Sequence, residues 1–186
     1  MTSQMPASGE ESGGNLAILG DALRSACVEL MAEYGLQARV DGGDKRLSIE
    51  PTMSALTAAV DFDGDELRGT VELRATRSLI FETSRGAAGL DSGAANLNDW
   101  TCELANQLMG RMKNKLRGYK VPLHVGVPRS KSSTDLARAE PGLRCRFACD
   151  CGTFSGYLDV LIAPGFSFGP LERDAELPLE GDLVLF

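Results

Sequence analysis

The sequence predicts an α+β domain of two layers, a mainly antiparallel sheet with two long helices packed on one face. Apolar residues recur at helical spacing in two long segments, 15–34 and 99–118. Elsewhere, short runs of alternating apolar and polar residues are separated by turn residues, as strands are. Because these strand runs follow one another through short turns, they favour antiparallel pairing and place both long helices on the same face.

The first long helix is expected to begin at Asn15, a good N-cap residue, and to end at Gly35, which suits a left-handed C-terminal cap. Residues 1–14 carry neither a basic start nor an apolar run, so they are not a signal peptide. Their Ser, Gly, Glu and Pro content is typical of a disordered tail.

The first strand runs are two pairs. Residues 36–40 and 45–50 flank an Asp-Gly-Gly-Asp turn, and residues 55–62 and 67–75 flank a hairpin turn at residues 63–65. Thr76 can then cap a short helix through Glu82, although the apolar residues there could also extend the strand.

After a loop of small residues, 85–97, the second long helix is expected to start near Asn98 or Asp99 and to end at Gly118. A strand over 121–127 closed by Pro128, a polar loop, and a hairpin of 143–151 with 154–163 complete the domain, which we place at 15–163. Residues 164–186 are a C-terminal extension whose final apolar residues are expected to dock as an edge segment.

The composition describes one medium-sized globular domain. The chain has 186 residues and a formal net charge of −7, which argues against nucleic acid or an anionic membrane as partner. No apolar stretch is long enough to span a bilayer, so the protein is expected to be cytoplasmic.

Three of the five cysteines, in the run CRFACDC, suggest a metal site with His124 as a fourth ligand. The spacing lacks the C-x2-C pattern typical of zinc sites, however. As a strand, the same run points Cys145, Cys149 and Cys151 to one side, which explains them as small core residues. We therefore expect no metal site.

One strip of the second long helix does not fit an ordinary amphipathic pattern. Glu103, Asn106, Gln107 and Gly110 lie on a side that avoids the apolar stripe. Asn and Gly are both poor helix formers, and Gly costs about 1 kcal/mol relative to Ala. Residue chemistry alone still favours a solvated face, with a docking surface as the alternative.

Asp99, Glu103, Asn106 and Pro128 form the pattern D-x3-E-x2-N-x21-P. This pattern resembles the signature of the CheC/CheX/FliY family of chemotaxis phosphatases, with Pro128 one residue nearer than in the family pattern. The framing sequence ELANQLMGRMKNKL is most similar to the CheX-like branch. The resemblance covers about residues 15–163 and is strongest over 99–128.

The resemblance implies a phosphatase for the aspartyl phosphate of a CheY-like response regulator, with Mg²⁺ held by the partner and no cofactor of its own. It implies that Asn106 orients the attacking water and that Glu103 pairs with a partner lysine, which suits the positional character of phosphoryl transfer. Asp99, Gln107 and Gly110 are expected to contact the partner, with helix capping as the alternative for Asp99. Relatives of the CheX branch resemble dimers, so a homodimer is also expected.

The first helix carries a partial echo of the motif, residues 25–32 against 99–106. Ser25 and Glu29 match, but Ala32 replaces the Asn and cannot hold a water. A single site is therefore expected. The main alternative to an enzyme is a binding module of the same fold. An enzyme acting on small molecules is not supported, because the sequence contains no nucleophile elbow, phosphate-binding loop or metal cluster.

Overall fold

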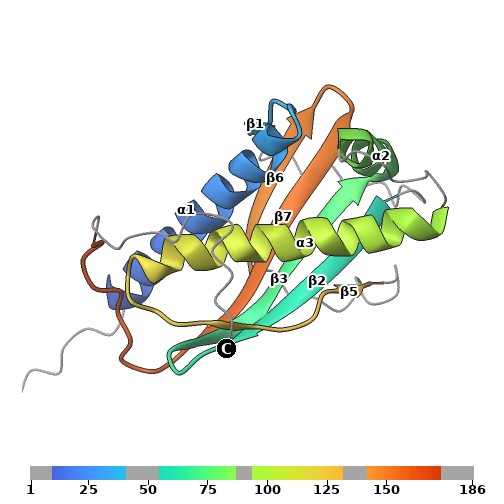
Figure 1. The fold of residues 1–186 in the computed structure, drawn as a ribbon. Coiled ribbons are helices and arrows are strands. Elements are labelled where there is room, and N and C mark those ends of the chain that lie inside the picture. Colours follow the sequence, from blue (N-terminus) through green and yellow to red (C-terminus); the bar gives the residue numbers. More distant parts are fainter. Residues whose placement is uncertain (1–9, 41–54, 87–93, 132–141, 173–186) are drawn as a thin grey trace, which may run out of the picture.

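The structure is a computed structural model that describes residues 10–40, 55–86, 94–131 and 142–172. A single twisted sheet is covered on one face by two long helices (Figure 1), so the predicted two-layer α+β class is confirmed. The helices are α1 (Glu10–Glu33), α2 (Arg77–Gly86) and α3 (Ala94–Arg117).

The strands form one seven-stranded sheet in the order β1-β6-β7-β3-β2-β4, with β5 also pairing with β2. Every strand pair recorded for the described residues is antiparallel. The strand bounds are β1 (Arg39–Val40), β2 (Ala55–Asp63), β3 (Leu67–Thr76), β4 (His124–Val125), β5 (Arg129–Ser130), β6 (Leu143–Cys149) and β7 (Gly152–Ile162).

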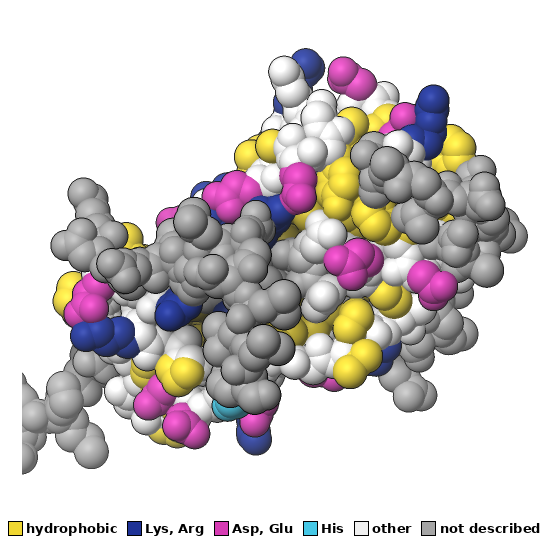
Figure 2. Space-filling view, viewed as in Figure 1, with side chains coloured by type: hydrophobic (Ala, Val, Ile, Leu, Met, Phe, Trp, Pro, Cys, Tyr) yellow, Lys and Arg dark blue, Asp and Glu magenta, His cyan; other side chains and the backbone are white. Residues whose placement is uncertain are grey.

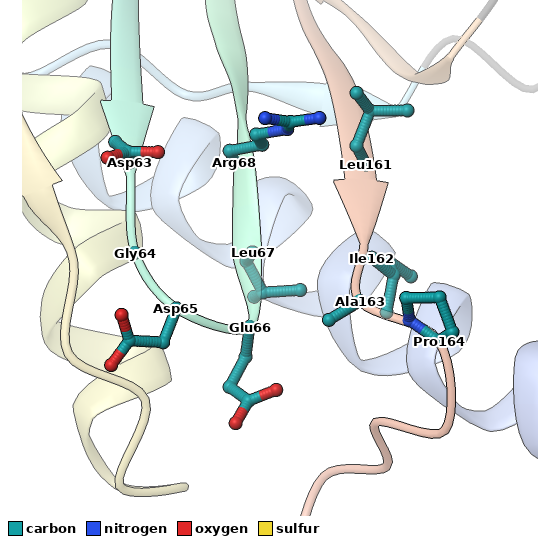
Figure 3. Close-up of a pocket in the computed structure, with 10 residues that line it drawn as sticks. All are labelled: Asp63, Gly64, Asp65, Glu66, Leu67, Arg68, Leu161, Ile162, Ala163 and Pro164. Carbon is teal, nitrogen blue, oxygen red and sulfur yellow. The ribbon is translucent and has the colours of Figure 1, made fainter.

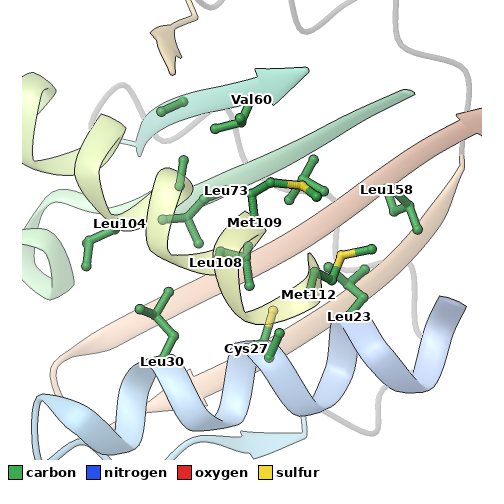
Figure 4. Close-up of a cluster of buried hydrophobic side chains, with 14 of the residues drawn as sticks. Leu23, Cys27, Leu30, Val60, Leu73, Leu104, Leu108, Met109, Met112 and Leu158 are labelled. Carbon is green, nitrogen blue, oxygen red and sulfur yellow. The ribbon is translucent and has the colours of Figure 1, made fainter. Parts of the chain in front are cut away.

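The core lies between the sheet and the paired helices α1 and α3 (Figure 4). On β3, alternate residues such as Val71 and Leu73 are buried toward the helices, as the period of two in a strand requires. Leu23 and Leu30 of α1 and Leu108 of α3 are fully buried against them. Each such Leu side chain contributes about 1.5–3 kcal/mol through its removal from water.

The opposite face of the sheet is polar and carries ion pairs. Glu72 of β3 is only 6% exposed and pairs with Arg74 at 3.3 Å and with Lys131 at 2.7 Å. Arg129 of β5 forms an ion pair with Asp61 of β2. These pairs attach the segment that follows the second long helix to the centre of the sheet.

The first helix begins five residues earlier than expected, at Glu10, so the predicted N-cap at Asn15 is wrong. Asn15 is instead buried in the helix, where its Nδ2 donates to the Phe166 carbonyl at 2.7 Å and its Oδ1 accepts from the Phe168 N–H at 3.1 Å. Residues 10–14, expected in the tail, are helical, and residues 1–9 lie outside the described residues.

The other differences concern short elements. The helix after Thr76 is confirmed as α2, and the alternative of a longer strand is wrong. The strand expected over 121–127 is reduced to the two residues of β4, and β5 follows Pro128 where a loop was expected. The expected strand at 45–50 and the apolar end of the chain lie outside the described residues.

The cysteines of β6 and of the turn that follows it are partly buried on the core side, as the strand alternation predicted. Cys145, Cys149 and Cys151 pack against the buried cluster. His124 lies on β4, four strands from β6 in the sheet, which corresponds to about 19 Å at the usual strand spacing. His124 and the cysteines therefore cannot share one metal ion, and no other metal-holding group of three or more His, Cys, Asp or Glu occurs among the described residues.

Within the same described residues, none of the helices combines the length and apolar character that crossing a membrane requires.

Candidate functional site

The sequence-predicted site residues all lie on α3, and the structure brings them to one face of that helix. Asp99, Glu103 and Asn106 are exposed, while Gln107 and Gly110 are partly buried. The intervening Leu104 and Ala105 are fully buried against the sheet. The buried side of α3 thus fixes the helix rotation that presents the polar strip to solvent.

The helix begins at Ala94, so its expected start near Asn98 or Asp99 is wrong. Asp99 lies in the second turn of α3, beyond the free N–H groups of the first turn, and therefore does not cap the helix. Its carboxylate is one helical turn before that of Glu103 on the same exposed strip. Figure 2 shows acidic side chains over this half of α3 with uncharged and apolar surface around them.

Asn106 borders an open hollow of about 460 Å³ between α3, the end of α1 and β4. The hollow is lined by Glu33, Asn106, Gln107, Gly110, Arg111, Lys113, Asn114 and Val125. Among the described residues, the Asn106 amide has no hydrogen-bond partner. A side-chain amide is both donor and acceptor, so Asn106 is free to bind a water or a group of another molecule.

Glu103 is not free to rotate in the same way. Gln107 Nε2 donates to Glu103 Oε1 at 3.0 Å, and Tyr34 of α1 donates its hydroxyl to Gln107 Oε1 at 2.8 Å. Tyr34 was expected only as part of the apolar stripe of the first helix, and its contact with the strip was missed. The sequence offers no signal for it, because the two residues are 73 positions apart.

Gly110 lies in the interior of α3, where a Cβ atom would meet no atom within 4 Å among the described residues. Packing inside the chain therefore does not require glycine at this position. The helix keeps a residue that costs about 1 kcal/mol relative to alanine. An approach by another molecule to this surface would explain the glycine.

The echo of the motif on the first helix is blocked by ion pairs. Glu29 accepts from Lys115 Nζ at 2.5 Å, and Glu33 pairs with Arg111. Ala32, at the position that matches Asn106, is exposed and has no polar group. α1 and α3 run in opposite directions (Figure 1), and Arg111 and Lys115 of α3 lie beside Glu33 and Glu29 of α1 and neutralise them.

A second hollow, of about 300 Å³, lies at the hairpin between β2 and β3 and the end of β7 (Figure 3). Asp63, Asp65 and Glu66 stand around it, with Leu161 and Ile162 from β7. It contains none of the residues predicted for the site.

The sequence model of a family described as chemotaxis phosphatase CheX matches residues 56–152, just over half of the chain. The protein therefore belongs to this family. The matched range includes β2 from its second residue, and all of β3, α2, α3 and β6, and so contains the whole polar strip. A search of curated proteins found no match.

Several solved structures share the fold. The chemotaxis protein CheX from Vibrio vulnificus is 15% identical, with a TM-score of 0.55 over 84% of this chain and 100% of that chain. CheX from Borrelia burgdorferi, solved as a CheX–CheY–BeF3–Mg²⁺ complex, is 12% identical, with a TM-score of 0.57 over 78% of this chain and 96% of that chain. A CheC-like protein from Shewanella oneidensis is 14% identical, with a TM-score of 0.54 over 78% of this chain and 96% of that chain.

Proposed function

We propose that this protein hydrolyses the aspartyl phosphate of a CheY-like response regulator, using the polar strip of α3. The observation that carries the proposal is the alignment of Asp99, Glu103 and Asn106, all exposed, along one face of a helix in a chain of the CheX family. The Borrelia burgdorferi relative, whose structure contains CheY, BeF3 and Mg²⁺, supports a partner of this kind.

Asn106 is proposed to orient the attacking water. Hydrolysis of a phosphoryl group depends on placing a water in line with the bond that breaks and on stabilising the charge that develops. The oxygen of a side-chain amide can accept a hydrogen bond from the water, and its nitrogen can donate one to a phosphoryl oxygen. The amide of Asn106 is exposed and has no hydrogen-bond partner within the described part of the chain, so it is suited to both contacts.

Glu103 is proposed to pair with a lysine of the partner. Its carboxylate is exposed and stands one turn before Asn106 on the helix. Gln107 uses only one oxygen of this carboxylate, so the other can accept from an ammonium group. The Mg²⁺ that neutralises the phosphoryl charge is proposed to belong to the regulator, so the phosphatase brings no cofactor of its own.

Asp99, Gln107 and Gly110 are proposed to border the contact with the regulator. Asp99 extends the acidic edge of the strip, and Gly110 keeps its middle flat. A homodimer and a cytoplasmic location accompany this proposal as expectations from the family. The second candidate is a module that binds the regulator without turnover, which the family fold also permits.

The test is the release of phosphate from a phosphorylated response regulator by the wild type and by Asn106→Ala. We expect the variant to lose on the order of 10²-fold or more in rate, because a misplaced water costs at least this much. Binding of the regulator should be largely retained, because Asn106 lies at the rim of an open hollow and makes no hydrogen bond to another side chain among the described residues.

Glu29→Ala is the matched control, since it removes the corresponding acid on α1, where it is paired with Lys115. Its turnover should be nearly that of the wild type. A large loss of turnover in a folded Glu29→Ala variant would mean that the site had been assigned to the wrong helix. Equal rates for Asn106→Ala and wild type would refute the role of Asn106, and binding without any acceleration by wild type would favour the non-catalytic module.

A further inference from the structure

We propose that Tyr34 and Gln107 are positioning residues, which hold the Glu103 carboxylate in one orientation for the cation of the partner. This inference rests on the proposed function and extends the site from α3 to the end of α1. It is carried by a chain of two hydrogen bonds, Tyr34 Oη to Gln107 Oε1 at 2.8 Å and Gln107 Nε2 to Glu103 Oε1 at 3.0 Å.

The direction of the chain follows from the donors and acceptors available. A carboxylate can only accept, so Gln107 must turn its Nε2 toward Glu103. The Gln107 oxygen then points away, to a place where only a donor can satisfy it. Tyr34 supplies that donor, because its hydroxyl carries a proton at neutral pH.

Two features keep the Tyr34 hydroxyl protonated. Burial, the largest influence, raises the pKa of Tyr34 above its usual range, and the neighbouring Glu33 and Glu103 raise it further. The charge of Arg111 lowers the pKa without reversing the shift. Tyr34 is therefore a constant donor, and the orientation of Gln107 does not change across the physiological pH range.

The backbone at Tyr34 is fixed by the end of α1. Gly35 has a positive φ of 71°, and the N–H of Leu36 donates to the Met31 carbonyl at 3.0 Å. This is the pattern of a left-handed helix cap, which glycine adopts at little cost. The glycine thus sets the position from which Tyr34 reaches α3.

The ring of Tyr34 is fixed by α3 and α2. Its edge contacts Trp100 at 5.8 Å between ring centroids, with the planes 83° apart, an attractive arrangement of two aromatic rings. Trp100 Nε1 donates to Thr83 Oγ1 at 2.9 Å, and this buried hydroxyl donates to the Ile80 carbonyl at 2.8 Å. Three helices therefore hold the hydroxyl that orients Gln107.

A carboxylate fixed in this way loses less conformational freedom when it binds a lysine than a free one does. Removal of the Tyr34 hydroxyl should therefore weaken binding of the regulator while leaving the chemical step nearly unchanged. Since one neutral hydrogen bond is lost, we expect an increase of about three- to tenfold in Kd and in KM, with kcat within about twofold.

The test uses Tyr34→Phe, which keeps the ring and its contact with Trp100, in the wild-type and Glu103→Ala backgrounds. Affinity is measured with the regulator in its BeF3 and Mg²⁺ form, and KM and kcat are measured by phosphate release. Tyr34→Phe should weaken binding in the wild-type background and have no effect in Glu103→Ala, because it acts through Glu103. Tyr119→Phe is the control, since Tyr119 is partly buried against Phe168 and contacts no residue of the strip.

NMR of the Gln107 side-chain amide provides a readout that needs no partner. The amide should be ordered in the wild type and become mobile in Tyr34→Phe. The variant should still unfold cooperatively, with a melting temperature lowered by no more than about 6 °C through the loss of one hydrogen bond. The positioning role is wrong if the wild type binds and turns over a regulator and Tyr34→Phe does so equally well. It is also wrong if Tyr34→Phe weakens binding by the same factor in the wild-type and Glu103→Ala backgrounds. Should wild type neither bind nor turn over any regulator, the proposed function fails, and an ordered amide would then show a chain that is only structural.

Discussion

Replacing Gly110 by alanine should make the protein more stable and make it a poorer partner for the regulator. Gly110 lies in the interior of α3, and a Cβ atom there would meet nothing within 4 Å among the described residues. The two effects therefore have separate origins, one in the helix and one in whatever approaches it.

The gain in stability follows from helix propensity. Alanine is better than glycine in a helix interior by about 0.8–1 kcal/mol, and no clash opposes the change. For a chain of this size, such a gain raises the melting temperature by about 2–4 °C. Thermal unfolding followed by circular dichroism measures it directly.

The loss of affinity follows from the added methyl group. If the regulator packs closely on the strip, the extra volume costs about 1–3 kcal/mol, or about 5- to 150-fold in Kd. Titration with the regulator in its BeF3 and Mg²⁺ form measures this loss.

Gly20→Ala is the matched control, because Gly20 is also inside a long helix with open space around its Cβ position. In the antiparallel pair of helices it lies about 20 Å along the axis from the level of Gly110. It should raise the melting temperature similarly and leave affinity unchanged. An unchanged affinity in Gly110→Ala, together with the expected gain in stability, would refute a close approach of the partner to this strip.

Two further predictions concern stability and reactivity. The hydrogen bond from Arg129 lowers the pKa of Asp61 from 3.8, burial opposes the shift and Thr70 assists it. A carboxyl whose pKa falls on folding stabilises the protein above its unfolded pKa, and this is lost as the pH falls through the lowered value. Asp61→Asn should therefore destabilise the protein at pH 7, by less than about 1 kcal/mol because the pair is half-exposed. In urea unfolding the difference should shrink below about pH 3.8, and a difference independent of pH would contradict the assignment. Burial also raises the pKa of the Cys27 thiol far above its usual range, so iodoacetamide should label Cys27 only when the chain unfolds; labelling under native conditions as fast as that of the partly exposed Cys102 would contradict its burial.

The periodic parts of the chain were predictable from the sequence. The stripes of α1 and α3 and the alternation of β2, β3, β6 and β7 repeat over many residues, and burial enforces each repeat. The cysteines of β6 illustrate this well. The two-residue period of a strand placed them correctly on the core side, although their clustering in the sequence had suggested a metal site.

The ends of elements were less predictable, because they depend on distant contacts. Asn15 has the chemistry of an N-cap, yet its side chain binds the backbone of Phe166 and Phe168, about 150 positions away. The helix then continues to Glu10. Likewise, α3 starts at Ala94 and Leu97 is buried, although the small residues around them suggested a loop.

Within the site, the residues of α3 followed from the motif, whereas Tyr34 did not. A helix stripe predicts that Tyr34 faces the core. Its ring does so in part, through the contact with Trp100. The direction of its hydroxyl depends on the crossing of α1 and α3, which one sequence does not reveal. Asp99 shows the converse case. The resemblance placed it on one helix with Glu103 and Asn106, as the structure has it, but the helix begins five residues before it, at Ala94.

The ion pairs between α1 and α3 also bear on how many regulators one chain can engage. Lys115 and Arg111 already pair with Glu29 and Glu33, whereas Glu103 has no ion-pair partner among the described residues, so in the proposed complex the lysine of the regulator would pair on α3. Two helices that share a partial motif are thereby made unequal in the acids that they offer to a cation. The proposed complex is accordingly one regulator per chain, and the asymmetry is enforced by charges already paired before the partner arrives.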